Sequence, residues 1–140
     1  MNTFRLAIYT LTIVVFAAVV WACIFLNVNV NDQSIFTLVN GITASTSVIV
    51  GFSGTIIGIM FREANEKQDN EARMFFFKAI AALMIPLTML WTTYAMLAIG
   101  GVWTPMAVRW GLSGLIMAFY VFSAVVIFIA KRLSAEIEKK

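Results

Sequence analysis

Hydrophobic and polar positions alternate in long blocks along the chain. Four mostly apolar stretches, residues 6–26, 34–61, 74–99 and 105–130, are separated by short segments at 27–33, 62–73 and 100–104. An α-helix needs about 20 apolar residues to cross a hydrocarbon core about 30 Å thick. Each stretch is long enough, so the pattern predicts an all-α integral membrane protein. Residues 1–140 then form a single membrane domain with four transmembrane helices.

The short links between the stretches predict how the helices are arranged. Consecutive helices joined by such links are antiparallel neighbours in helical bundles, so we expect an antiparallel four-helix bundle. Gly100 and Gly101 predict the end of the third helix, and Thr104 followed by Pro105 predicts the N-cap and first residue of the fourth. Helix formers dominate residues 62–73, so we expect helices two and three to extend as a solvated hairpin that turns near residues 68–70.

The cationic side chains gather where the four helices would emerge on one side of a bilayer. Short loops rich in Lys and Arg remain cytoplasmic, which predicts that both termini and the central charged loop are inside. Trp21, Trp103 and Trp110 fall near the opposite boundary, as expected for an interfacial aromatic belt. The nine cations on the predicted inner side are Arg5, Arg62, Lys67, Arg73, Lys78, Lys131, Arg132, Lys139 and Lys140.

Composition narrows the function classes. The chain is 61% hydrophobic and 12% charged, so its expected surroundings are a lipid bilayer, and we expect a multi-pass protein of the cell membrane. The net charge of +3 follows from the inner rim, and we expect no nucleic-acid partner. There is no histidine, one cysteine and no acid within the predicted spans, so we expect no metal site, no cofactor and no enzymatic activity.

The second stretch carries a stripe of small residues. Its members recur at spacings of four and three and include a GxxxG motif at Gly54 and Gly58. The opposite face of the same repeat carries bulky residues: Ile35, Leu38, Ile42, Ile49, Phe52, Ile56 and Ile59. Association of helices in lipid depends on close backbone approach at small residues. The sequence therefore predicts a helix-packing seam. The residues of this stripe are Asn40, Ala44, Ser47, Gly51, Gly54 and Gly58.

Two interpretations of this stripe compete. In the first, it packs against helix one, three or four, or against another copy of the chain, while hydroxyls of the same helix bond to backbone carbonyls or across helices. In the second, uncharged oxygens line a hydrated pathway and replace part of an ion's hydration shell. The candidate pathway-lining residues are Asn40, Thr43, Ser47, Thr55 and Arg109.

Arg109 lies about one turn into the fourth helix. An arginine within a span marks a functional hypothesis, but its guanidinium can also reach back to the headgroups. We consider three arrangements: extension to the outer headgroups, pairing with Asp32, and contact with an anion or substrate. Nearby, Gly111, Ser113 and Gly114 form a small patch that predicts a packing contact.

Two functional hypotheses follow. The first is a small self-associating polytopic membrane protein, a homo-oligomer with an ion or small-solute pathway near the second helix. The second is a non-conducting structural or accessory subunit of a larger membrane complex, with other membrane subunits as its partners.

Overall fold

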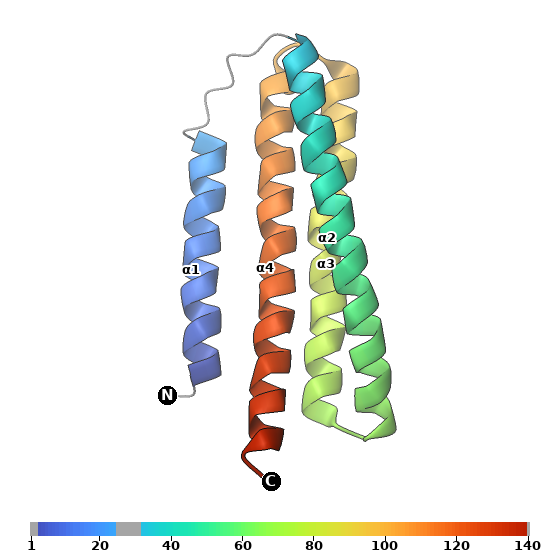
Figure 1. The fold of residues 1–140 in the computed structure, drawn as a ribbon. Coiled ribbons are helices and arrows are strands. Elements are labelled where there is room, and N and C mark those ends of the chain that lie inside the picture. The colour runs from blue at the N-terminus through green and yellow to red at the C-terminus, as the bar shows by residue number, and fades with distance from the viewer. Residues whose placement is uncertain (1–2, 25–31, 140) are drawn as a thin grey trace.

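Four long helices make up the part of the chain that the structure describes. The computed structural model describes residues 3–24 and 32–139, without the side chains of Ile24 and Asp32. The helices are α1 (Thr3–Ile24), α2 (Asp32–Glu66), α3 (Asn70–Ile99) and α4 (Trp103–Ile137), and no strand occurs in these residues (Figure 1). All four are long and apolar enough to cross a membrane. They contain the four predicted spans, apart from residues 25–26, which lie outside the described residues.

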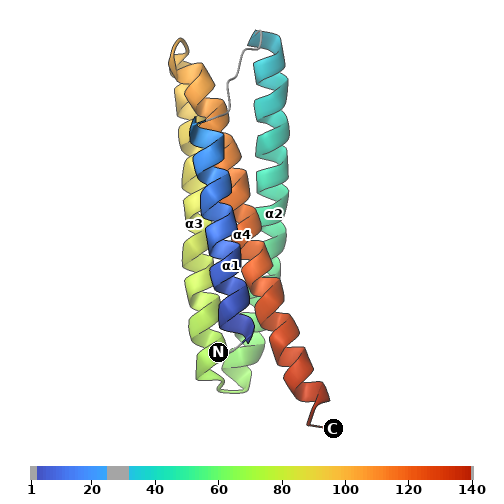
Figure 2. The same ribbon diagram turned by 90° about the vertical axis from the view of Figure 1, so that its left-hand side faces the viewer.

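The four helices differ in how many neighbours they pack against. α2, α3 and α4 pack against one another, whereas the backbone of α1 approaches only α4 among the described helices (Figures 1 and 2). The expectation that consecutive helices are neighbours is therefore wrong for α1 and α2. Seven residues, 25–31, separate the two helices. Since an extended chain covers about 3.3–3.6 Å per residue, this link can reach past a neighbouring helix.

Two apolar clusters form the interior. The larger one contains Ile57, Phe76, Val125 and Phe128, and Phe4 of α1 packs at its edge. The smaller one, near the other end of the bundle, joins Ile35, Val39 and Ile42 of α2 to Val108 of α4. Each cluster draws side chains from helices far apart in sequence, so side-chain packing defines the arrangement of α2, α3 and α4.

α3 and α4 approach closely at the small patch of α4. Gly111 and Gly114 are buried, and a Cβ added at Gly114 would lie 3.1 Å from Met89 Cβ and 3.7 Å from the Pro86 carbonyl oxygen. A Cβ at Gly111 would lie 3.3 Å from Thr93 Cγ2. The prediction that this patch is a packing contact is confirmed. Small residues here allow two backbones to come together in surroundings where apolar burial alone gains little.

The turn between α3 and α4 begins as predicted, but α4 begins earlier. Gly100 caps α3 with φ 73°, and Gly101 follows with φ 60°. These left-handed conformations bring the Trp103 and Thr104 amides onto the Gly100 and Gly101 carbonyls at 3.2 and 3.1 Å. Trp103 is therefore the first helical residue, and the prediction that Thr104 is the N-cap is wrong. Pro105 remains in the first turn, where its missing N–H costs no intrahelical bond.

We expect Gly114→Leu to destabilise the protein, because the added side chain must displace Met89 or the α3 backbone. Overpacking of this kind typically costs about 1–3 kcal/mol. Gly41→Leu is the matched control, since nothing lies within 4 Å of a Cβ added at Gly41. The measurement is unfolding of both variants in mixed detergent micelles. Equal losses of stability would contradict the close approach of α3 and α4.

Candidate functional site

The stripe on α2 faces away from the rest of the chain. Its six residues are all exposed, and a Cβ added at Gly51, Gly54 or Gly58 would meet no atom within 4 Å. The interpretation in which the stripe packs against helix one, three or four is therefore wrong. Packing against another copy, or against a different membrane protein, stays a prediction.

A different row of α2 residues faces the interior. The row includes Val39, Thr46, Ser53 and Ile57, and it lies roughly a third of a turn from the stripe. Of the bulky residues assigned to the far face, Ile35 and Ile42 are buried, while Leu38, Phe52 and Ile59 are exposed. Sorting the residues of α2 into small and bulky faces thus identified the stripe, but it did not identify the face that is buried.

The candidate pathway residues do not converge within one chain. Asn40 and Ser47 are exposed on the stripe. The Thr55 hydroxyl donates to the Gly51 carbonyl at 3.0 Å, and the Thr43 hydroxyl is enclosed and has no hydrogen-bond partner. Arg109 faces α1 instead, so the structure separates it from the other four candidates.

Hydroxyls inside the bundle are largely satisfied by their own helices. Thr46, Thr93 and Ser113 donate to carbonyls four residues earlier, at 2.8, 2.7 and 2.9 Å. Ser53 is fully buried and its hydroxyl has no partner. These hydroxyls spend their donors on backbone carbonyls of their own helix and do not point toward a ligand. The arrangement therefore indicates a packed interior and not a pathway inside one chain.

Arg109 joins α4 to α1 near the end where α1 finishes. Its Nη1 donates to the Cys23 carbonyl at 3.2 Å. The next residue, Trp110, donates through Nε1 to the Thr92 hydroxyl of α3 at 2.5 Å. Trp21 and Trp103 are exposed at this same end, as the predicted aromatic belt requires. Pairing of Arg109 with Asp32 is not tested, because the Asp32 side chain lies outside the described residues.

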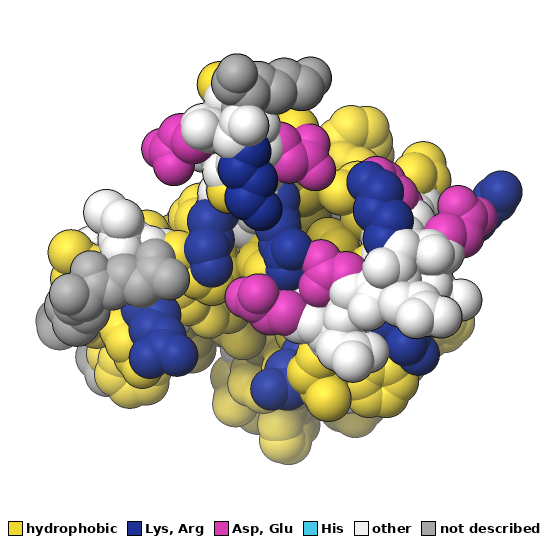
Figure 3. Space-filling model, turned by 90° about the horizontal axis from the view of Figure 1, so that it is seen from below, with side chains coloured by type: hydrophobic (Ala, Val, Ile, Leu, Met, Phe, Trp, Pro, Cys, Tyr) yellow, Lys and Arg dark blue, Asp and Glu magenta, His cyan; other side chains and the backbone are white. Residues whose placement is uncertain are grey.

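Most of the charged side chains gather at the other end of the bundle. Viewed from that end, the Lys, Arg, Asp and Glu side chains surround the α2–α3 turn and the end of α4 (Figure 3). The predicted hairpin is confirmed: α2 ends at Glu66, α3 begins at Asn70, and Gln68 adopts a left-handed φ of 53° between them. Lys67 Nζ lies 2.6 Å from Glu63 Oε1, an i,i+4 ion pair at the end of α2.

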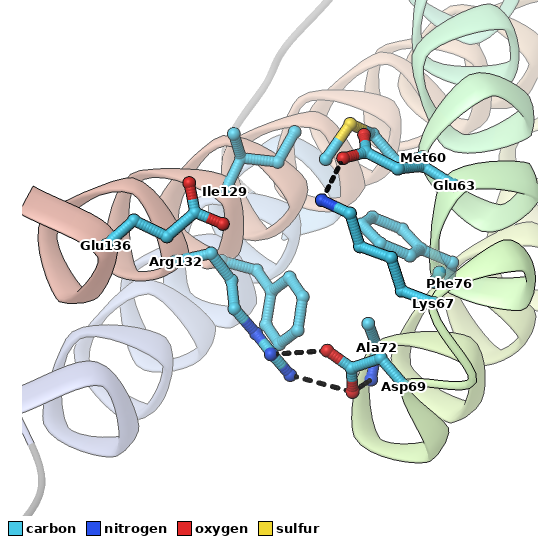
Figure 4. A pocket seen from close by; sticks show the side chains of 11 residues that line it. Met60, Glu63, Lys67, Asp69, Ala72, Phe76, Ile129, Arg132 and Glu136 are labelled. Atoms are coloured by element: carbon cyan, nitrogen blue, oxygen red, sulfur yellow. Dashed lines mark hydrogen bonds and ion pairs between the residues drawn. The ribbon is translucent and has the colours of Figure 1, made fainter. Parts of the chain in front are cut away.

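An ionic contact between this turn and α4 is the feature that sequence reasoning missed. Asp69 is the N-cap of α3, since its Oδ1 accepts a hydrogen bond from the Ala72 amide at 3.1 Å. Arg132 Nη1 and Nη2 donate to the same carboxylate at 2.5 and 3.2 Å (Figure 4). Nη2 also donates to Glu71 at 3.2 Å. The guanidinium lies over the Phe128 ring at 5.2 Å. Thus one carboxylate both starts α3 and holds α4 beside it.

Two pKa values report this geometry. The pKa of Asp69 lies below its ordinary 3.8, mainly because the Ala72 amide bonds the charged form, with a further contribution from Arg132. The pKa of Lys67 lies above its ordinary 10.5, chiefly through the hydrogen bond to Glu63. A hollow of about 90 Å³ separates the two pairs, with Glu136 at its rim and Phe76 and Phe128 in its wall (Figure 4). The two cations that line the hollow, Lys67 and Arg132, are both paired with carboxylates. The pair of Arg132 with Asp69 links α4 to the start of α3, so we interpret this end as a structural contact between helices.

Neither a metal site among the described residues nor a similar known protein indicates a function. Among the described residues, no group of three or more His, Cys, Asp or Glu side chains could hold a metal ion. Comparisons of the chain with protein-family models, with curated proteins and with solved structures found no match.

We expect Asp69→Ala to destabilise the protein more than Asp69→Asn. Alanine loses both the cap, worth about 1 kcal/mol, and the pair with Arg132, whereas asparagine keeps a capping oxygen. The contribution of the pair itself is smaller, because both side chains are partly exposed. Unfolding in mixed micelles at pH 7 measures the order of the two variants.

Lowering the pH tests whether the charge of Asp69 contributes to stability. Because the folded pKa of Asp69 is depressed, its stabilisation is present above pH 3.8 and is lost as pH falls through the folded pKa. The stability difference between the native protein and Asp69→Asn should therefore shrink below pH 4. A difference that stays constant from pH 7 to pH 3 would show that the carboxylate charge contributes nothing.

Proposed function

We propose that this chain is a small self-associating membrane protein whose copies pack through the outer stripe of α2. The observation that carries the proposal is the open space at Gly51, Gly54 and Gly58 on a lipid-exposed helix. From Asn40 to Gly58 the stripe extends about 27 Å, close to the thickness of a hydrocarbon core. A second α2 could therefore lie against it along most of a span, with the close backbone contact that small residues permit.

The order of residues along the stripe also favours a particular pathway. Asn40 and Ser47 are exposed toward the end where α2 begins, whereas glycines occupy the half toward the α2–α3 turn. Copies arranged about an axis would then enclose a polar outer half above a narrow glycine contact. We propose that ions or small polar solutes enter this outer half, where amide and hydroxyl oxygens substitute for hydration. Arg109 lies on the α1 side and has no part in this lining.

The orientation that we propose places the charged end in the cytoplasm. Eight of the nine inner-side cations lie in the described helices, in the α2–α3 turn or just after α4, at the end viewed in Figure 3, and Lys140 lies outside the described residues. Positively charged short loops remain inside during insertion. Both termini would then be cytoplasmic in a cell membrane.

Cysteine labelling in sealed cells measures this orientation. In a Cys23→Ala background, which removes the single native thiol, a membrane-impermeant maleimide should label Val102→Cys but not Asn65→Cys. Val102 is 80% exposed and Asn65 is exposed, so access differs only by the side of the membrane. Labelling of Asn65→Cys in intact cells would reverse the proposed orientation.

Mass in nanodiscs or mild detergent tests self-association. The native protein should assemble, and Gly54→Leu should dissociate it without lowering the stability of the single chain, because Gly54 is exposed and nothing lies within 4 Å of a Cβ added there. Val48→Leu, on an exposed part of α2 beside the stripe, is the matched control and should leave the assembly intact. A native protein that remains a monomer would favour the alternative of an accessory subunit with a different partner.

Flux through the same assemblies in liposomes tests the pathway. The double variant Asn40→Leu and Ser47→Ala keeps side-chain size nearly constant while removing the polar groups, so flux should fall at least about tenfold with the oligomeric mass unchanged. Ser45→Ala is the control, since Ser45 is exposed but lies in the row of Leu38 and Phe52, off the stripe. A well-defined assembly that conducts none of the ions or solutes tested would exclude the pathway while leaving self-association in place.

A further inference from the structure

A hollow lies between α2 and α3, close to the turn that joins them (Figure 1). It encloses about 380 Å³, and the residues that line it all belong to these two helices. They are Phe61 of α2 and Asn70, Arg73, Met74 and Phe77 of α3. We call this hollow the hairpin groove. It shares no lining residue with the hollow beside Arg132, so the two are separate.

The lining of the hairpin groove changes from polar to apolar along α3. Asn70 is the first residue of α3 and Arg73 follows about one turn later, whereas Phe77 lies about 10 Å beyond Asn70 along the helix axis. Met74 and Phe77 are 57% and 63% exposed. Because α2 and α3 are long and apolar enough to cross a membrane, the polar end of the groove would lie at the headgroups and the apolar end in the hydrocarbon.

Arg73 brings a positive charge into the groove, and it is partly buried there. Its Nη1 donates to the Asn70 side-chain oxygen at 3.4 Å, which is a long bond to a neutral group. Asp69, four residues before Arg73, binds Arg132 instead. Among the residues that the structure describes, no carboxylate forms an ion pair with Arg73. The charge of Arg73 is therefore complementary to an anion from outside the chain.

The order of these groups favours a lipid over a soluble anion. A guanidinium matches the oxygens of a phosphate with its planar fork of N–H donors. A free phosphate would contact Arg73 and leave the apolar part of the groove unfilled, whereas a phospholipid carries an acyl chain next to its phosphate. The thioether of Met74 adapts its shape to such a flexible chain, and the two phenylalanines add apolar surface.

We propose that the hairpin groove binds one anionic phospholipid, with its phosphate against Arg73 and an acyl chain along Phe61, Met74 and Phe77. An anionic headgroup complements the charge of Arg73, whereas the choline group of phosphatidylcholine would offset the phosphate. The site requires the charged end of the bundle to lie at a membrane surface. Its lining comes from a single hairpin, so it does not depend on association through the stripe of α2.

Native mass spectrometry of the full chain tests this site. The protein is released from mixed micelles that contain phosphatidylglycerol and phosphatidylcholine, with the same acyl chains, at equal mole fraction. One phosphatidylglycerol per chain should be retained about fivefold more often than phosphatidylcholine, which is the preference that one nearby cation supplies. The same spectra report the oligomeric mass, so bound lipid is counted per chain.

Substitution of Arg73 identifies the cation responsible. Arg73→Gln should reduce the preference to about one, because glutamine removes the charge. Arg73→Lys should restore most of the preference, which separates loss of charge from loss of folding. Arg62→Gln is the matched control, since Arg62 is a cation at the same end that pairs with Glu66 and does not line the groove. The preference should survive this change.

A soluble headgroup distinguishes a lipid site from an anion site. Glycerol 3-phosphate, compared with chloride at equal ionic strength, should not displace the bound phosphatidylglycerol, because it has no acyl chain to fill the apolar part of the groove. Displacement would assign Arg73 to a free anion and overturn the proposal.

Four further results would overturn it: equal retention of the two lipids, a preference that survives Arg73→Gln, an equal loss of preference in Arg62→Gln, and retention of neither lipid. The third would attribute the preference to the general charge of this end of the bundle. Gly54→Leu should dissociate the assembly and leave the lipid preference of each chain unchanged. Failure of this site and failure of the proposed self-association are therefore distinguishable.

Discussion

Close approach of backbones at α4 is the constraint on which the rest of the structure depends. α4 contacts each of the other three helices, and buried Gly111 and Gly114 allow α3 to lie against it. In lipid an apolar side chain gains little by moving from acyl chains to another helix, so packing density decides which helices associate. Because α2 packs in the angle between α3 and α4, its orientation also follows from this contact. The face left outward then carries the small residues.

α1 is held in a different way. It contacts its neighbours at three levels: Phe4 against Phe75 and Phe128 at the charged end, Thr12 against Tyr120 at 3.1 Å, and Cys23 with Ser113 and Arg109 near its end. Side-chain hydrogen bonds between membrane helices contribute only about 0.6 kcal/mol each on average. Separate contacts of this size fix α1 on α4 without closing the space beside α3. The backbone of α1 therefore lies against α4 and does not approach α2 or α3.

Helix positions could be predicted from the sequence, because apolar length, the Gly100–Gly101 pair and the polar turn at 67–69 are local signals. The glycine contact of α4 could also be predicted, since Gly111 and Gly114 are three residues apart and share one face. The inward face of α2 was not, because in lipid neither size nor polarity determines which face is buried, and the buried row mixes Val39 and Ile57 with Thr46 and Ser53. The contact between Asp69 and Arg132 joins positions 63 residues apart, among several acids and bases that could pair.

The two ends of the bundle are therefore fixed by different chemistry. At the charged end, Asp69 caps α3 and binds Arg132, and Lys131 and Arg132 also lie over Phe4 and Phe128. These contacts bring α1, α3 and α4 together where water and headgroups can solvate the remaining charges. At the other end, Arg109 donates to a backbone carbonyl of α1, and the backbone of α3 does not approach α1. Contacts at one end thus join α4 to α3, contacts at the other end join α4 to α1, and the stripe of α2 lies outside both sets of contacts.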